Sequence, residues 1–215
     1  MNPHGRLTPI QVRVLDAFFA AERGFFLSGG GALVGFHLQH RETMDLDLFT
    51  SSIEAFDRAR HELPIILEAM RGSLVVRQDA PGFRRVVVRL GGDELVVDLV
   101  RDIGLQCHPK VEMAGVVVDP LEEIFSNKLT TLVSRQEVRD LVDVLEIERR
   151  GLRVEDYLAE AKAKDGGCTP ATLAWLLAEW KIADVAKLPP GYSVQELRTF
   201  KDSLVDRLAT VALPR

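Results

Sequence analysis

Residues 27–33 read LSGGGAL, and residues 40–49 read HRETMDLDLF. In the second stretch acidic and apolar residues alternate, which predicts a strand whose Asp45 and Asp47 side chains project from one face while the leucines beside them enter the core. Two adjacent carboxylates repel each other unless a cation neutralises them. Paired hard oxygen ligands suit Mg²⁺, which keeps waters and substrate phosphates as its other ligands. This strand therefore predicts a metal site.

The first stretch places Ser28, Gly29, Gly30 and Gly31 between a predicted strand and a predicted helix. Glycines let backbone N–H groups approach a phosphate closely, and the N-terminus of a helix adds a favourable dipole. A phosphate cradle within twenty residues of an acid pair indicates phosphoryl or nucleotidyl transfer to a hydroxyl group.

Asp98 is the single ionisable residue in the apolar run 95–100. Burying a lone carboxylate is costly, so we expect it to meet a cation or hydrogen-bond donors, the alternative being a position at the end of a sheet that faces water. Beside Asp45 and Asp47 it would complete a set of three carboxylates for two Mg²⁺ ions, one activating the hydroxyl and one steadying pyrophosphate. Asp98 would then be the candidate general base.

The chain changes character after residue 118. Residues 1–118 predict an α/β core, and residues 119–215 predict a helical region, with no internal repeat. The expected strands are 25–27, 45–49, 73–78, 84–90, 94–100 and 115–118, and the expected helices are 9–23, 32–38, 53–71, 119–134, 137–150, 155–164, 170–181 and 194–208.

Charge, cysteine content and the lengths of the apolar runs argue against several classes of protein. The net charge of −5, from 27 basic and 32 acidic residues, is not that of a general nucleic-acid coat protein. Cys107 and Cys168 lie far apart and indicate two reduced thiols. The sequence shows no signal peptide and no apolar run long enough for a membrane span, so we expect a cytoplasmic protein without a membrane partner.

The glycine run followed by His-Arg-x-Thr-x-Asp-x-Asp-Leu-Phe resembles the AbiEii/AbiGii nucleotidyltransferase toxin family over about residues 25–145. The resemblance implies an α+β fold of the DNA polymerase β-like superfamily: a mixed sheet flanked by helices, followed by a helical C-terminal half. It also implies a bacterial toxin with a cognate antitoxin. The chain departs from many members at Gly31, where they carry a threonine or serine whose hydroxyl would help to hold the phosphate.

The resemblance extends to a lysine and an Arg-Asp-x-x-Asp segment, matched here by Lys128 and residues 139–143. It implies that Lys128 touches the triphosphate and that Asp140 orders the site or the acceptor. The residues themselves leave a second interpretation open, because Arg139 and Asp143 are four apart on a helix and could form a surface ion pair.

Other basic residues admit two interpretations. Arg41 could contact a phosphate or the acceptor, or pair with a carboxylate and fix the loop, whereas His40 favours a turn hydrogen bond. Two further groups of arginines could neutralise an RNA backbone or simply form solvated faces: Arg84, Arg85 and Arg89, and Arg149, Arg150 and Arg153.

The expected activity is Mg²⁺-dependent transfer of a nucleoside monophosphate from an NTP such as ATP to an acceptor hydroxyl. The family resemblance implies RNA as the acceptor, with the 3′ end of tRNA as the expected target. Two alternatives remain open: a transferase of the same fold that modifies a small molecule such as an aminoglycoside or a protein hydroxyl, and a non-catalytic binding module.

Overall fold

The computed structural model describes residues 5–213, which form two compact units. Unit 1 comprises Met1–Gly104 and His108–Pro120, and unit 2 comprises Leu105–Cys107 and Leu121–Arg215. The domain division expected after residue 118 stays a prediction. No helix within residues 5–213 combines the length and the apolar character needed to cross a bilayer.

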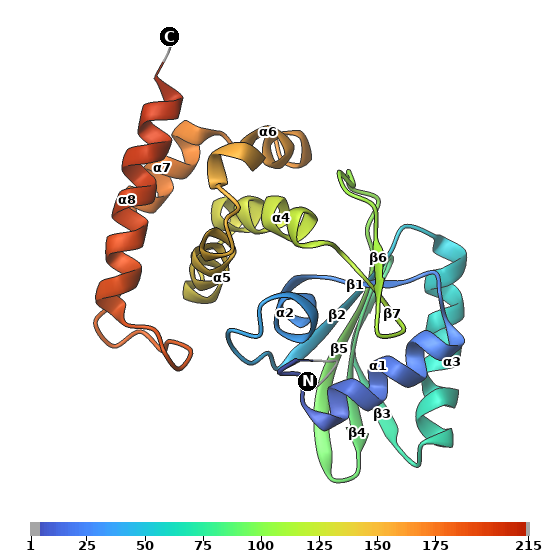
Figure 1. The fold of residues 1–215 in the computed structure, drawn as a ribbon. Coiled ribbons are helices and arrows are strands. Elements are labelled where there is room, and N and C mark those ends of the chain that lie inside the picture. Colours follow the sequence, from blue (N-terminus) through green and yellow to red (C-terminus); the bar gives the residue numbers. More distant parts are fainter. Residues whose placement is uncertain (1–4, 214–215) are drawn as a thin grey trace. The chain divides into compact units, whose positions relative to one another are not determined.

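Unit 1 is built on one mixed sheet of seven strands in the order β3-β4-β5-β2-β1-β7-β6 (Figure 1). The β2/β5 and β1/β7 pairs are parallel, and the other neighbours are antiparallel. The strands are β1 (Phe26–Leu27), β2 (Asp45–Thr50), β3 (Ser73–Ala80), β4 (Phe83–Leu90), β5 (Asp93–Arg101), β6 (Val111–Met113) and β7 (Val116–Val118).

Two helices, α1 (Pro9–Ala21) and α3 (Ile53–Ala69), lie together on one side of this sheet (Figure 1). Thr8 caps α1 through a reciprocal capping box with Gln11. The core includes the apolar side chains that alternate along the central strands, all at most 4% exposed: Leu46, Leu48, Val86, Val88, Leu95, Val97 and Leu99. The opposite face of the same strands is thereby left for polar side chains.

A short helical segment joins β1 to β2. The α-helix α2 (Gly29–Ala32) continues directly into the π-helix η1 (Leu33–His37). The sequence predicted a helix from residue 32, but the helix begins within the glycine run, whose residues form its first turn.

Unit 2 is helical. Figure 1 shows α7 and α8 lying side by side, and α4 packs against α5, α6 and α7. The helices are α4 (Leu121–Ser134), α5 (Val138–Arg149), α6 (Val154–Lys164), α7 (Pro170–Glu179) and α8 (Val194–Ala212).

The fold class is confirmed as α+β, with a mixed sheet flanked by helices and a helical C-terminal half. The short edge strand β6 was not predicted from the sequence. It pairs with β7 through a turn in which both Ala114 and Gly115 have positive φ, at 49° and 82°. Alanine gives no sequence signal for such a turn, because the left-handed conformation is unfavourable for it.

Candidate active site

The three predicted carboxylates lie on one face of the sheet in unit 1. Asp47 on β2 is directly opposite Asp98 on the parallel neighbour β5, and Asp45 is two residues earlier on β2. Residues opposite each other in neighbouring strands point to the same side of a sheet, as do residues two apart. Asp98 is only 4% exposed, whereas Asp45 and Asp47 are half-buried.

The glycine run lies against this face. Gly29 has a φ of +59°, and a Cβ built there would be 3.4 Å from Oδ2 of Asp47. Glycine adopts this conformation without strain. The buried Ser28 precedes it, and its backbone N–H donates to the carbonyl oxygen of Asp47 over 3.3 Å. The strand-to-helix turn and the acid pair, separate in the sequence, are therefore in direct contact.

Arg41 and Thr43 complete the loop that leads into β2. Arg41 is 3% exposed, and its Nη1 donates to the carbonyl oxygen of Glu42 over 2.9 Å. A Cβ at Gly30 would be 3.0 Å from Nη2 of Arg41 and 3.1 Å from Oγ1 of Thr43. This burial favours a role for Arg41 in fixing the loop, and its contact with a phosphate stays a prediction.

Thr43 stands in the quoted His-Arg-x-Thr-x-Asp pattern, but no role was predicted for it from the sequence. Its hydroxyl donates to Oδ1 of Asp45 over 2.9 Å. Its carbonyl oxygen accepts from Nε2 of Gln11 on α1 over 3.0 Å. Thr43 thus orients one carboxylate of the site and ties it to the first helix. Its place in the loop two residues before Asp45 is the signal that could have indicated this role.

Gly31 faces the core. A Cβ there would be 3.0 Å from Cδ1 of Leu27 and 3.4 Å from Cδ2 of Leu46. A larger residue at this position would need Leu27 to move by a few tenths of an ångström. Leucine side chains thus border the position at which, by the resemblance, many members of that family carry a threonine or serine.

Arg85 is the direct partner of Asp98. It stands opposite Asp98 across the β4/β5 pair. Its Nε and Nη2 donate to the two carboxylate oxygens over 2.8 and 2.6 Å. The sequence predicted a cation or donors for Asp98, and both are confirmed. From the sequence, Arg85 was interpreted only as an RNA contact or a surface residue. Its pairing with Asp98 was not predicted.

The carboxylates of this site supply the hard oxygen donors that Mg²⁺ prefers. Asp45 and Asp47 on one strand face fit a single ion. Asp98 differs, because both of its oxygens already accept from a guanidinium. Within residues 5–213, no three acidic, histidine or cysteine side chains are grouped so that they could hold a metal ion. A divalent ion at Asp98 would have to displace this guanidinium, so the chemistry of Asp98 does not favour the expected second ion. Binding of Mg²⁺ at Asp45 and Asp47 stays a prediction.

Lys128 and Asp140 belong to unit 2, where they form a buried cluster with Asp143. The Nζ of Lys128 is 2.7 Å from Oδ1 of Asp140 and 2.7 Å from Oδ2 of Asp143. Arg135 adds a second cation to Asp140 at 2.8 Å. The three clustered side chains are at most 8% exposed, so this cluster joins α4 to α5. A role for Lys128 and Asp140 in nucleotide binding stays a prediction.

Neighbouring charges shift the pKa values of Lys128 and Asp140 in this cluster. Burial alone would lower the pKa of Lys128, but the charges of Asp143 and Asp140 outweigh it and raise that pKa. Burial would likewise raise the pKa of Asp140, but Lys128 and Arg135 outweigh it and lower that pKa. Both shifts favour the charged forms of Lys128 and Asp140.

The surface pair considered between Arg139 and Asp143 does not form. Arg139 pairs with Glu137 at 2.9 Å, and the Asp143 carboxylate is fully buried beside Lys128. Four-residue spacing brings two side chains to one helix face, but the neighbouring helix α4 offers Asp143 a buried partner.

The remaining arginines considered as RNA contacts are largely engaged by carboxylates. Arg89 pairs with Glu94 across the β4/β5 hairpin, and Arg84 lies 3.9 Å from Asp79. In unit 2, Arg149 pairs with Glu146 and Glu196, and Arg153 lies near Glu148 and Glu155.

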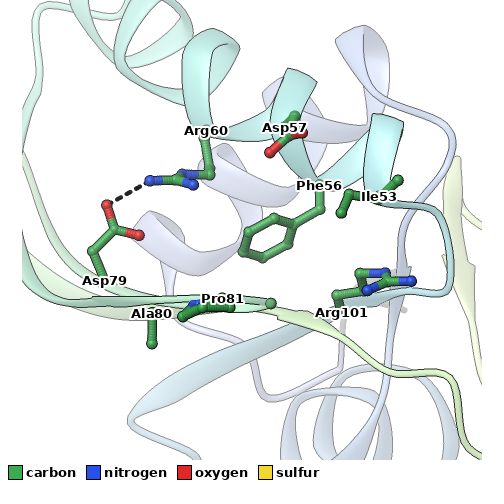
Figure 2. A pocket seen from close by; sticks show the side chains of 9 residues that line it. Ile53, Phe56, Asp57, Arg60, Asp79, Ala80, Pro81 and Arg101 are labelled. Carbon is green, nitrogen blue, oxygen red and sulfur yellow. Dashed lines mark hydrogen bonds and ion pairs between the residues drawn. The ribbon is translucent and has the colours of Figure 1, made fainter.

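Unit 1 also carries an open pocket of about 600 Å³ where α3 meets the β3/β4 turn (Figure 2). Phe56 lies at its centre, and an ion pair between Arg60 and Asp79 of 2.7 Å closes one side. None of the predicted site residues lines this pocket. A smaller pocket of about 330 Å³ includes Thr43 and the exposed Met44, next to the strand that carries Asp45.

A protein-family model matches most of the chain. The family described as "Nucleotidyl transferase AbiEii toxin, Type IV TA system" matches residues 13–210. No curated protein matches the chain.

Solved structures resemble the chain in fold. MenT4, a nucleotidyltransferase toxin of Mycobacterium tuberculosis H37Rv, has a TM-score of 0.65 at 14% identity, with 95% of this chain and 82% of MenT4 covered. JHP933 from Helicobacter pylori has a TM-score of 0.58 at 19% identity, with 93% and 89% covered.

Proposed function

The chain belongs to the AbiEii nucleotidyl transferase toxin family, and on this premise we propose that it transfers a nucleoside monophosphate from an NTP to a hydroxyl of tRNA. The observation that carries the proposal is that Asp45, Asp47 and Asp98 share one sheet face beside the glycine run. We further propose that it acts in the cytoplasm and that a cognate antitoxin binds it.

In the proposed reaction the acceptor hydroxyl oxygen bonds to the α-phosphorus of the NTP. The bond from that phosphorus to the bridging oxygen of the β-phosphate breaks, and pyrophosphate leaves. Asp98 receives the hydroxyl proton. Arg85 uses two of the roughly four lone-pair positions of the Asp98 carboxylate, so acceptor positions remain.

Asp45 and Asp47 would hold Mg²⁺, which when bound would neutralise charge on the phosphate oxygens. Thr43 fixes Asp45 through its hydroxyl, so that carboxylate is oriented before any ligand arrives. The backbone of residues 28–31 would approach the phosphates, since the absence of side chains permits this.

A specific observation favours a small-molecule acceptor as the second candidate. The net charge is −5, and the arginines considered as RNA contacts are largely paired with carboxylates. Binding of tRNA should weaken steeply as salt rises, whereas binding of a small acceptor should change little. A titration of acceptor binding at several salt concentrations separates the two candidates.

The proposal is tested with NTPs labelled at the α- or the γ-phosphate, incubated with Mg²⁺, total tRNA and a protein mixture. We expect the α-label in tRNA, and a loss on the order of 10³-fold in Asp45→Asn. Arg89→Gln is the matched control, because Arg89 lies on the same β4/β5 hairpin as Asp98 and pairs with Glu94, not with Asp45, Asp47 or Asp98. Equal labelling by Asp45→Asn and the unchanged chain would refute the mechanism, and transfer of the γ-label would indicate a kinase-like reaction.

A further inference from the structure

Arg85 stands where a second cation of the site would be expected. Its guanidinium makes a fork to both oxygens of Asp98. Fork-shaped pairs of this kind are among the stronger charge-assisted hydrogen bonds. The Asp98 side chain is 5% exposed and that of Arg85 is 46% exposed, so the pair is buried on the carboxylate side and open on the arginine side.

The positive charge of Arg85 interacts with all three carboxylates, those of Asp98, Asp45 and Asp47. Its pKa is raised, first by the hydrogen bond to Asp98 and the charge of Asp98, and then by the charges of Asp45 and Asp47. The Phe83 ring lies 5.8 Å from the guanidinium carbon, a distance at which an aromatic face attracts a cation. Register, hydrogen bonds and ring contact therefore fix one positive charge beside the three carboxylates.

We infer that Arg85 takes the place of a second divalent ion, so that this site holds one ion at Asp45 and Asp47 and none beside Asp98. A divalent ion at Asp98 would have to displace the Arg85 fork and would be repelled by its charge. Arg85 is thus a positioning residue, which orients Asp98 and sets the number of metal ions. This inference rests on the proposed function only in assigning the ion to Asp45 and Asp47.

The test counts metal ions directly, without NTP or RNA. Mn²⁺ is titrated into the full chain, and the bound fraction is followed by electron paramagnetic resonance. We expect about one ion per chain for the unchanged protein and about two for Arg85→Gln, because hard carboxylate oxygens freed from the fork become ligands. Asp45→Asn should remove the ion that the unchanged protein binds.

Two variants serve as controls for the metal count. Arg89→Gln removes an equivalent cross-strand pair between β4 and β5, that with Glu94 at 2.7 Å, and should leave the count at one. Arg85→Lys keeps the charge and should also leave it at one. Far-UV circular dichroism confirms that each variant is folded.

Any result in which Arg85→Gln binds the same number of ions as the unchanged protein overturns the inference, as does a count of two for the unchanged protein. Failure of the proposed function would have a different signature: no label is transferred to any acceptor, while the metal count still rises in Arg85→Gln.

Discussion

Carboxylates occur in both units, in opposite settings. On the sheet face of unit 1, Asp45 and Asp47 are half-buried, and Gly29 lies beside Asp47. In unit 2, Asp140 and Asp143 are at most 1% exposed and share the ammonium of Lys128. Under the proposed function the first pair binds a ligand, whereas the second is neutralised by the protein itself.

The two pairs of aspartates have similar spacing in the sequence, but this difference in burial and pairing indicates different effects on stability. Removing one member of a buried, paired set leaves an uncompensated charge in the interior, which is strongly destabilising. Removing one half-buried carboxylate from a group of like charges relieves repulsion and leaves no buried charge. Stability measurements can therefore distinguish the two groups of acids without any substrate.

The largest expected effect is that of Lys128→Met. It leaves two buried carboxylates with one fewer cation, and we expect unit 2 to lose about 3–5 kcal/mol of unfolding free energy. The two tryptophans, Trp175 and Trp180, both lie in unit 2. Their emission during urea unfolding therefore reports on this unit. A loss below about 1 kcal/mol would place the cluster among weak surface pairs.

The second prediction concerns pH. The lowered pKa of Asp140 stabilises the fold above the ordinary aspartate range, and this contribution is lost as the pH falls from about 4 towards the folded pKa. The raised pKa of Lys128 stabilises the fold below the ordinary lysine value, and this contribution is lost as the pH rises above about 10.

The urea midpoint of tryptophan emission, measured across this range, should therefore show a plateau that falls at both ends. The same profile for Lys128→Met should show a smaller alkaline fall. Part of the fall remains because burial also raises the pKa values of Cys168 and Tyr192 in unit 2. An alkaline fall of equal size in that variant would assign the effect to other groups.

The third prediction concerns the half-buried carboxylates of unit 1. Asp45→Asn should change the unfolding free energy of unit 1 by less than about 1 kcal/mol, because an asparagine oxygen still accepts from the Thr43 hydroxyl. Urea unfolding followed by far-UV circular dichroism measures it. A large loss of stability would mean that Asp45 is structural and that lost transfer in this variant reflects unfolding.

The smallest expected effect is that of Arg139→Ala. Arg139 pairs with Glu137 on the surface, with exposures of 50% and 40%. Exposed pairs contribute roughly 0.2–1 kcal/mol, so the tryptophan-detected midpoint should barely move. A loss comparable to that of Lys128→Met would erase the distinction between surface and buried pairs in unit 2.

Much of the carboxylate face could be predicted from the sequence. Alternation along residues 45–49 predicts the shared face of Asp45 and Asp47. The Gly91-Gly92 pair between the expected strands 84–90 and 94–100 is typical of a two-residue hairpin turn. That two-residue turn also fixes the register, and counting back from it pairs Arg85 with Asp98. The partner of Asp98 could therefore have been found from strand register.

The buried cluster of unit 2 could not be predicted in the same way. Lys128 and Asp143 meet because α4 packs against α5, and helical spacing within one segment carries no information about the facing helix. Spacing suggested Arg139 as the partner of Asp143 instead. Gly31 is a similar case, because only the packed positions of Leu27 and Leu46 show that it faces the core.

The segment Leu105–Cys107 has a practical consequence. It belongs to unit 2, although the chain before and after it belongs to unit 1. Within unit 2 the backbone N–H of Cys107 donates to Glu123 over 2.9 Å, and Lys164 donates to the carbonyl oxygen of Leu105 over 2.7 Å. A protease that cut only after Pro120 would leave this segment on the first fragment, still hydrogen-bonded to the second. The nicked protein should migrate as one species until it is denatured, and residues 121–215 expressed alone would lack part of their own unit.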